Sequence, residues 1–282
     1  MEVIDHPYFS DIRRTMSRII NKVKLFPNDN EEAQRIASEL SSLLQKYHFE
    51  IADKEYDLAI AIGGDGAFLR MVKQTAFNSN VYYIGINCGT LGFLQEIKPG
   101  EMNQFIDRVN SDDFKLEETS IQETVVHRKH NSSHFYSLND VVIRDKKLKT
   151  THLTLKVNDN LLEEFVGDGI LISTSVGSTA YNLSFGGSIV YGMLHTLQIT
   201  PIAPLNSKAY RTLQNSVIIP EDRVITIVPK ETNKNLLLTI DGENNSYKNV
   251  EQIVTRVGDK KIYCLRMNEY DYTNIIHDKF VK

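Results

Sequence analysis

The chain has 282 residues, 41% of them hydrophobic, which is enough for one large domain or two modest ones with a buried core. Its formal net charge of −4 argues against bulk binding to nucleic acid or to a membrane surface. No signal-peptide pattern or bilayer-length apolar run is found, and Cys88 and Cys264 lack metal-ligand or redox spacing, so we expect a cytoplasmic protein with two inert thiols.

Helical and strand patterns alternate over residues 1–115. A strand over 21–26 is followed by a helix that we expect to start at Asp29 and Glu32. The apolar run 58–62 does not alternate, which is typical of a strand covered on both faces. A helix over 67–76, a strand over 81–86 and a proline-started helix over Met102, Phe105, Ile106 and Val109 follow. The pattern predicts a doubly wound α/β domain. The first helix has one apolar face, made of Ala33, Ile36, Ala37, Leu40, Leu43, Leu44 and Tyr47.

Short β-rich runs dominate residues 116–255, and they predict a mainly antiparallel β domain. A hairpin turn is expected at Asn158-Asp159-Asn160. The segment 256–282 carries enough apolar residues to pack back on the first domain, and no role is assigned to the amphipathic residues 1–18. The expected strands cover 123–128, 135–144, 153–157, 161–165, 170–174, 224–228 and 236–240.

A single carboxylate lies among three glycines in Gly63-Gly64-Asp65-Gly66, directly after the buried strand over 58–62. Glycines let backbone N–H groups approach a phosphate, which the Asp65 charge would repel, so we expect Asp65 to face a hydroxyl or a metal ion beside it. Arg70 can reach the same phosphates, and the loop 87–94 follows the next strand, so both loops are expected to line one crevice. In isolation, tight turns and a solvated Arg70 explain the motif equally well.

Two further motifs lie in the β-rich half. Gly167-Asp168-Gly169 precedes a strand, and a hydroxyl-rich stretch, 173–184, follows it. The stretch suits a polyhydroxylated or phosphorylated ligand, with Tyr181 stacked on a ring, although alone it reads more simply as a Ser/Thr-rich turn into a capped helix. Asn139 and Asp140 interrupt an apolar run. They mark a strand end or bulge, or they need polar partners.

Together these motifs resemble those of the NAD kinase family, which phosphorylates the 2′-hydroxyl of the adenosine ribose of NAD. The resemblance covers about residues 20–265. Gly-Gly-Asp-Gly alone is shared with lipid kinases and, more loosely, phosphofructokinases, but its combination with Gly177-Ser178-Thr179-Ala180-Tyr181 is specific. The other matching segments are Gly85-Ile86-Asn87, Gly89, Leu91-Gly92-Phe93-Leu94, Leu138-Asn139-Asp140, Gly167-Asp168-Gly169, Leu183-Ser184, Gly186-Gly187, Thr200-Pro201-Ile202-Ala203-Pro204 and Asp241-Gly242.

The resemblance implies an active site between an α/β and a β domain, in a homotetramer or dimer. It implies NAD as substrate, with ATP and Mg²⁺ or another divalent cation; another nucleotide or polyphosphate as donor stays open, and no metal ligands are assigned. The resemblance assigns Asp65 the role of the base. Because a carboxylate is a weak base toward a sugar hydroxyl, Asp65 is expected mainly to orient the hydroxyl and to accept its proton late. The implied nucleotide-binding positions are Gly63, Gly64, Gly66, Ala67, Phe68, Arg70, Asn87, Asn139, Asp140, Thr150, Asp168, Val176, Thr179, Ala180, Tyr181, Asn182, Leu183, Ser184, Ala203 and Gly242.

Within these positions, Asn139 and Asp140 are expected at the ribose and adenine of NAD. Asp168 and the stretch 179–184 are expected at the nicotinamide or a second adenosine. The chain also departs from the family pattern. Ala67 stands where Thr is usual, which removes one phosphate donor but leaves the backbone amide; Ser175 and Val176 replace Pro and a hydroxyl residue. Val166 replaces a basic residue, which weakens any charge contact there.

Two other classes of function stay open at this stage. A non-catalytic NAD(P)-binding regulator would keep Asn139 and Tyr181 but could lose the phosphate site. A diacylglycerol-type lipid kinase would share the glycine motif, yet it does not explain residues 177–181. A Rossmann dehydrogenase and a P-loop kinase are disfavoured, because no Gly-x-Gly-x-x-Gly follows a predicted strand and no Gly-Lys-Ser/Thr triplet occurs.

Overall fold

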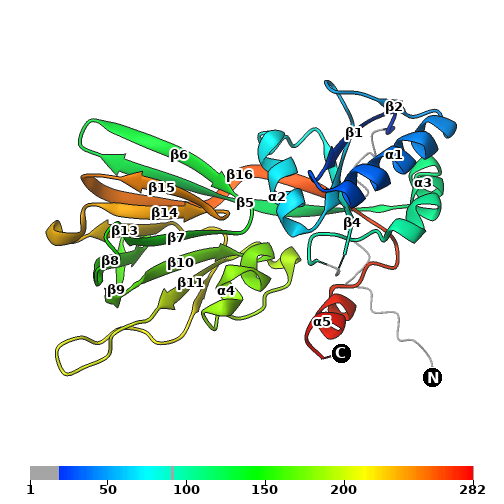
Figure 1. The fold of residues 1–282 in the computed structure, drawn as a ribbon. Helices are drawn as coiled ribbons and strands as arrows, with labels where there is room; N and C mark the ends of the chain where they lie inside the picture. Colours follow the sequence, from blue (N-terminus) through cyan, green and yellow to red (C-terminus); the bar gives the residue numbers. More distant parts are fainter. Residues whose placement is uncertain (1–18, 90–91, 282) are drawn as a thin grey trace. The chain divides into compact units, whose positions relative to one another are not determined.

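The computed structural model describes residues 19–89 and 92–281. The amphipathic residues 1–18 and the motif residues 90–91 lie outside the described residues, so the expectations placed there are not addressed. The described chain falls into two compact units (Figure 1). Unit 1 contains the described residues up to Val72, together with Asn80–Glu117 and those from Tyr263 onward; unit 2 contains Lys73–Ser79 and Glu118–Ile262.

Unit 1 is built on a parallel sheet with strand order β2-β1-β3-β4. The end of a long strand, β16 (Val250–Arg266), continues the parallel pairing, with Tyr263 opposite Tyr82. The strands of unit 1 are β1 (Lys22–Pro27), β2 (Glu50–Ile51), β3 (Leu58–Gly63) and β4 (Tyr82–Asn87). The helical elements are α1 (Glu31–Lys46), α2 (Asp65–Gln74), η1 (Pro99–Glu101), α3 (Met102–Asn110) and α5 (Tyr272–Phe280).

The helices and strands predicted for this half are confirmed, but some of them begin or end at other residues than predicted. Every residue of β3 and β4 is buried, as expected for strands covered on both faces. The cap of α1 is Asn30, whose side chain accepts a hydrogen bond from the amide of Ala33 at 2.8 Å, so the predicted start at Asp29 is wrong. Helix α2 begins at Asp65 rather than at 67, which places that carboxylate in the first turn.

Unit 2 is a β unit with two sheets. The strand pairs within it whose register is described are antiparallel. One sheet contains β16-β13-β8-β9 with β5 and β6 alongside, and the other runs β12-β11-β10-β7-β14-β15. The strands are β5 (Lys115–Arg128), β6 (Asn131–Ser137), β7 (Asp140–Asp145), β8 (Thr151–Val157), β9 (Asn160–Gly167), β10 (Gly169–Thr174), β11 (Leu197–Ile202), β12 (Val217–Ile219), β13 (Ile225–Pro229), β14 (Leu236–Ile240) and β15 (Glu243–Tyr247). The short helical elements are η2 (Val176–Thr179), α4 (Tyr181–Ser184), η3 (Gly192–Leu194) and η4 (Glu231–Asn233).

The core of unit 2 lies between its sheets, because buried residues of one cluster come from both of them, for example Leu155 of β8 and Ile172 of β10. Asn158 and Asp159 have φ of 48° and 64°, which confirms the predicted hairpin turn. The single strand predicted over 135–144 is wrong: β6 and β7 are separate strands that part at residues 138–139. None of the described helices combines the length and apolar character needed to cross a bilayer.

Candidate functional site

Asp65 lies at the end of β3, where its carboxylate is fixed by the loop that follows β4. Its Oδ2 accepts a hydrogen bond from the amide of Phe93 and its Oδ1 one from the amide of Leu94, both at 2.9 Å. A Cβ on Gly92 would lie 1.9 Å from Asp65 Oδ1, so only glycine allows this approach. The loops that were expected to line one crevice therefore do meet, and Asp65 joins them.

The glycine loop presents an open backbone surface. Gly63 has a positive φ of +151°, and Gly64 and Gly66 are exposed to solvent. An added Cβ on Gly64 would meet no atom within 4 Å, so a phosphate has room to approach. The Gly64 carbonyl accepts from the Ala67 amide and from Gln95 Nε2, each at 2.8 Å. The Ala67 amide, which the sequence leaves in place of a threonine hydroxyl, therefore donates within the loop in this structure.

The other predicted residues of unit 1 divide into two groups. Arg70 is exposed, and its Nη2 donates to Asn28 Oδ1 at 2.5 Å, which holds the guanidinium near Gly66. Asn87 is buried and uses Nδ2 to bond the Gly89 carbonyl at 2.6 Å. Phe68 is buried with the core. Arg70 can contact a ligand through its side chain, whereas Asn87 and Phe68 shape the loops.

Asp241 organises the Asn139-Asp140 region of unit 2. Asp241 and Gly242 have φ of 44° and 85° and form the two-residue turn between β14 and β15. The Asp241 carboxylate accepts from three consecutive amides, those of Leu138 at 2.8 Å, Asn139 at 2.8 Å and Asp140 at 3.1 Å. These bonds take the amides that a continuous strand would have used, which explains why β6 and β7 are separate.

Asn139 and Asp140 are both buried, and the surrounding chain does not fully satisfy the polar groups of either side chain. Asn139 Oδ1 has no hydrogen-bond partner among the described atoms. Burial, and then the negative charge of Asp241, raise the pKa of Asp140 to about 7. Burial also raises the pKa of Asp241, although its three amide bonds and the charge of Lys73 oppose this. Lys73 itself forms an ion pair with Glu243. The partners that the sequence demanded for these two residues are only partly supplied by the chain.

Residues 173–184 form a compact turn whose polar groups are mostly used internally. The fully buried Asn182 amide donates to the Ser178 carbonyl at 3.0 Å and accepts from Thr200 Oγ1 at 2.5 Å. A Cβ on Gly177 would lie 2.0 Å from the Asn139 carbonyl oxygen, so this turn packs directly on the Asn139 backbone. The Asn182 side chain therefore holds the turn, and ligand contact falls to its exposed neighbours, Tyr181 and Ser184.

The remaining predicted positions surround that turn or lie at the ends of its strands. The Tyr181 ring is 44% exposed and packs edge-on against Phe185 at 4.7 Å between centroids, while Arg144 donates to its hydroxyl at 3.4 Å. The backbone of Asp168 pairs with Ile202, and its carbonyl accepts from Thr151. The half-buried or exposed positions are Thr150, Val176, Thr179, Ala180, Leu183 and Ala203.

The sequence reasoning gave no role to three supports of these sites: Asp241, which it named only as part of a matching segment, Gln95 and the Lys73–Glu243 pair. The Asp-Gly dipeptide of a hairpin was a signal for Asp241, but nothing local pointed to the other two. Among the described residues, no three acidic, histidine or cysteine side chains are grouped so as to hold a metal ion.

The glycine loop on the parallel sheet of unit 1 and the β-rich unit 2 are together typical of a phosphotransferase that acts on nucleotides. Comparison with known families supports this class. The ATP-NAD kinase N-terminal domain family matches residues 15–114, and the ATP-NAD kinase C-terminal domain family matches residues 138–267. The chain belongs to the ATP-NAD kinase family, and its activity is ATP-dependent phosphorylation of NAD.

Relatives match over nearly their whole length. An NAD kinase of Finegoldia magna is 37% identical over 274 residues, which cover 94% of this chain and 98% of the relative. NAD kinase 2 of Bacillus subtilis is 30% identical over 263 residues, 92% of this chain and 97% of the relative.

Two solved structures share the fold at lower identity. Yeast NADH kinase in complex with NADH has a TM-score of 0.81 at 21% identity, covering 94% of this chain and 88% of that one. An NAD kinase from Archaeoglobus fulgidus in complex with ATP has a TM-score of 0.71 at 19% identity, covering 90% and 97%.

Proposed function

We propose that the phosphoryl group goes to the 2′-hydroxyl of the adenosine ribose of NAD, with Asp65 as the residue that orients this hydroxyl. The observation that carries the proposal is the fixed carboxylate: two amides of the 92–94 loop hold both oxygens at 2.9 Å beside an open glycine loop. Each oxygen keeps a lone pair for the hydroxyl proton. Because a carboxylate is a weak base toward a sugar hydroxyl, Asp65 acts mainly by positioning and accepts the proton late.

The transferred phosphate is proposed to bind at the glycine loop. Gly64 and Gly66 leave room for close approach, and the start of α2 directs its partial positive charge to the same place. Arg70, held by Asn28, supplies a full positive charge near Gly66. These groups stabilise the charge of the phosphoryl oxygens during transfer.

The NAD ribose and adenine are proposed to bind at Asn139 and Asp140. A buried amide oxygen without a partner costs free energy until a donor reaches it, and a ribose hydroxyl or the adenine amino group is such a donor. Asp140 offers a second acceptor next to it. The exposed Tyr181 ring is proposed to lie against a base of the dinucleotide, with Asp168 and Ser184 near its sugar or amide.

Mg²⁺ or another divalent cation is proposed to accompany ATP. The described residues form no cluster of three metal-binding side chains, so we assign it no protein ligands and expect the nucleotide phosphates to carry it. Its contribution there is to neutralise phosphate charge. The active site between two domains, with 116–255 binding NAD, stays a prediction. So do the cytoplasmic location, which agrees with two free cysteines, and a homotetrameric or dimeric assembly.

The test replaces Asp65 by Asn and measures NADP formation from NAD, ATP and Mg²⁺. We expect kcat/KM to fall by about 10³-fold, because the oriented acceptor of the proton is lost. Asp57→Asn is a matched control, since Asp57 Oδ2 in the same unit also accepts from two backbone amides, those of Asn21 and Lys22 at 2.9 Å. Both variants neutralise an aspartate that binds backbone amides of unit 1, but only Asp65→Asn should lose activity.

Two results would count against the proposal. Equal activity of Asp65→Asn and Asp57→Asn would remove Asp65 from the reaction. Tight NAD binding by the unmodified chain without any NADP would favour the regulator. The comparisons lend no support to the lipid kinase.

A further inference from the structure

Phe93 connects the last helix of the chain, α5, to the carboxylate of Asp65. The Phe93 amide donates to Asp65 Oδ2 at 2.9 Å. The ring of the same residue packs against two rings of α5, with centroid distances of 6.4 Å to Tyr272 and 5.6 Å to Phe280. The Lys279 ammonium lies 5.8 Å from the centre of the Phe93 ring, within the range of a cation–π contact. Among the described residues, these aromatic and cationic contacts of the ring all come from α5.

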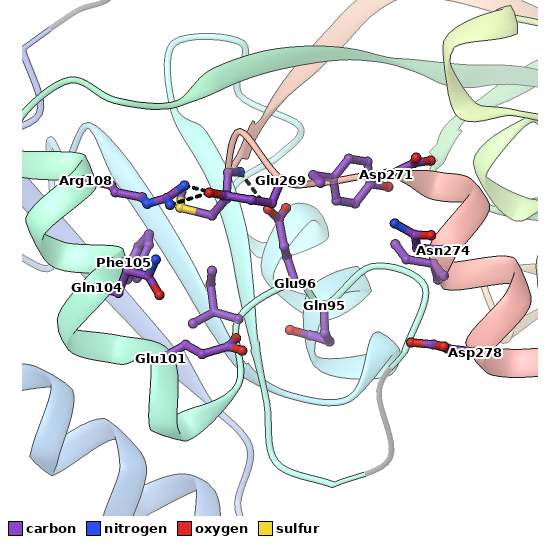
Figure 2. A pocket seen from close by; sticks show the side chains of 14 residues that line it. Gln95, Glu96, Glu101, Gln104, Phe105, Arg108, Glu269, Asp271, Asn274 and Asp278 are labelled. Atoms are coloured by element: carbon purple, nitrogen blue, oxygen red, sulfur yellow. Dashed lines mark hydrogen bonds and ion pairs between the residues drawn. The ribbon is translucent and has the colours of Figure 1, made fainter. Parts of the chain in front are cut away.

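The segment that follows Phe93 is held by other elements. The Gln95 side chain is 1% exposed and donates to the Gly64 carbonyl at 2.8 Å. The amides of residues 96–97 donate to the Gly85 carbonyl of β4 at 3.0 and 3.1 Å. Figure 2 shows this segment between α3 and α5. The glycine loop and β4 therefore fix the segment, whereas α5 fixes the ring of Phe93.

Helix α5 itself is attached to unit 1 by few buried groups. Of its nine residues, all of them described, only Ile275 is buried. A pocket of about 350 Å³ lies between α3 and α5, and Figure 2 shows Asn274 and Asp278 of α5 at its edge. Elements with few buried contacts open locally at a lower cost in free energy than the unfolding of the whole unit. The contacts with the Phe93 ring are therefore an important part of what keeps α5 in place.

The position of the Phe93 amide depends on the position of its ring. The ring is joined to the backbone through Cβ, so a ring that is held by α5 restricts where its own amide can lie. A hydrogen bond weakens steeply as its distance and angle leave the preferred range. Leu94, the other donor to Asp65, is 7% exposed, so its own buried side chain holds it. The Phe93 amide is therefore the donor that α5 controls.

We propose that α5 positions Asp65 for phosphoryl transfer by holding the Phe93 ring, which keeps the Phe93 amide on the carboxylate. Phe93, Tyr272 and Phe280 are positioning residues, because they act through Asp65. This role of α5 rests on the proposed role of Asp65. Release of the ring lets the carboxylate turn away from the substrate hydroxyl, which lowers kcat. The groups proposed to bind the phosphates keep their own hydrogen bonds, so KM changes little.

The first test replaces Phe280 by Ala and measures the kinetics of NADP formation with the full chain. Phe280 is 48% exposed, so the variant should fold. We expect kcat to fall about tenfold and the KM values for NAD and ATP to stay within about twofold. Phe280→Tyr keeps the ring and should keep kcat within about twofold of the parent. Tyr56→Ala is the matched control with unchanged kcat, because Tyr56 of unit 1 also packs against one ring, that of Phe26, at 6.2 Å.

Amide hydrogen exchange gives a second readout that does not depend on activity. The Phe93 resonance in a ¹⁵N NMR spectrum is assigned by selective labelling of phenylalanine and by its loss in Phe93→Leu. We expect exchange of the Phe93 amide to be at least about fivefold faster in Phe280→Ala. The Ile97 amide, which donates to the Gly85 carbonyl, should keep its exchange rate.

Four results would overturn this role of α5. They are an unchanged kcat in Phe280→Ala, an equal loss of kcat in Tyr56→Ala, a raised KM with the parental kcat in Phe280→Ala, and unchanged exchange of the Phe93 amide. Failure of the proposed role of Asp65 looks different. In that case Asp65→Asn is fully active, whereas the Phe93 amide still exchanges faster in Phe280→Ala.

Discussion

Asp65 in unit 1 and Asp140 in unit 2 are aspartates at two candidate contact points for one reaction, but their surroundings differ. Asp65 is half-buried, and two backbone amides contact its carboxylate. Asp140 is 4% exposed and lies near a second carboxylate, Asp241, which takes the three nearest amides. The first site compensates its carboxylate within the chain, whereas the second leaves an electrostatic cost that a bound ligand can offset.

The largest effect expected from this contrast concerns the pH dependence of stability. The pKa of Asp140 is raised from 3.8 to about 7, so its neutral form is favoured in the fold. Its contribution to stability is complete below pH 3.8 and is lost as the pH rises to about 7. At about 1.4 kcal/mol per pKa unit the loss is at most about 4 kcal/mol, shared with Asp241 because the two titrate together.

Asp140→Asn removes this cost. We expect its free energy of unfolding to exceed that of the parent at pH 8 and to equal it at pH 4, measured by chemical denaturation, while NADP formation falls. A constant difference between the two pH values would show that Asp140 is not the source of the cost.

Gly177→Ala is expected to have the next largest effect, on the packing of unit 2. The new Cβ would lie 2.0 Å from the Asn139 carbonyl oxygen and 2.5 Å from its carbon, and backbone atoms give way less readily than side-chain ends. Destabilisation of about 3 kcal/mol or more is expected from thermal or denaturant unfolding. A fully stable variant would mean that the turn is not packed on Asn139.

Asp241→Asn tests the amides that bind Asp241, for comparison with those that bind Asp65. Asn tolerates the positive φ of 44° but has one carbonyl oxygen for three amides, so about 2 kcal/mol of stability should be lost. The loss should exceed that of Asp65→Asn, because the Asp65 carboxylate accepts from two amides and the Asp241 carboxylate from three. The reverse order of the two unfolding free energies would contradict the contrast between the units.

The smallest effect is expected for Gly92→Ala. Its Cβ would approach Asp65 Oδ1 to 1.9 Å, but that oxygen ends a side chain and can move at the cost of its amide bond. We expect about 1–2 kcal/mol of destabilisation and a lower kcat, because the carboxylate is displaced. Gly64→Ala is the control for stability, since its Cβ would meet nothing within 4 Å. Matching losses of stability would refute the steric argument.

Much of the fold could be predicted from local patterns. The apolar run of β3 and the Asn158-Asp159 turn follow from period and turn chemistry, and both are confirmed. The division of the predicted strand 135–144 could not be foreseen, because the acceptor of its amides, Asp241, lies 103 residues from Leu138. The residues of the proposed site were also predicted from short motifs, but only the structure shows that the Asn182 side chain holds a turn.

The sequence by itself determined the elements, the glycine loop and the family, because these depend on residue types at short and ordered spacings. Only the tertiary structure decided what each polar group contacts. Phe93 and Leu94, 28 and 29 residues after Asp65, donate to it, and Asp241 comes to residues 138–140 from a different hairpin. Burial and hydrogen-bond partners depend on such long-range contacts, and they set which carboxylate is compensated by backbone amides and which is not.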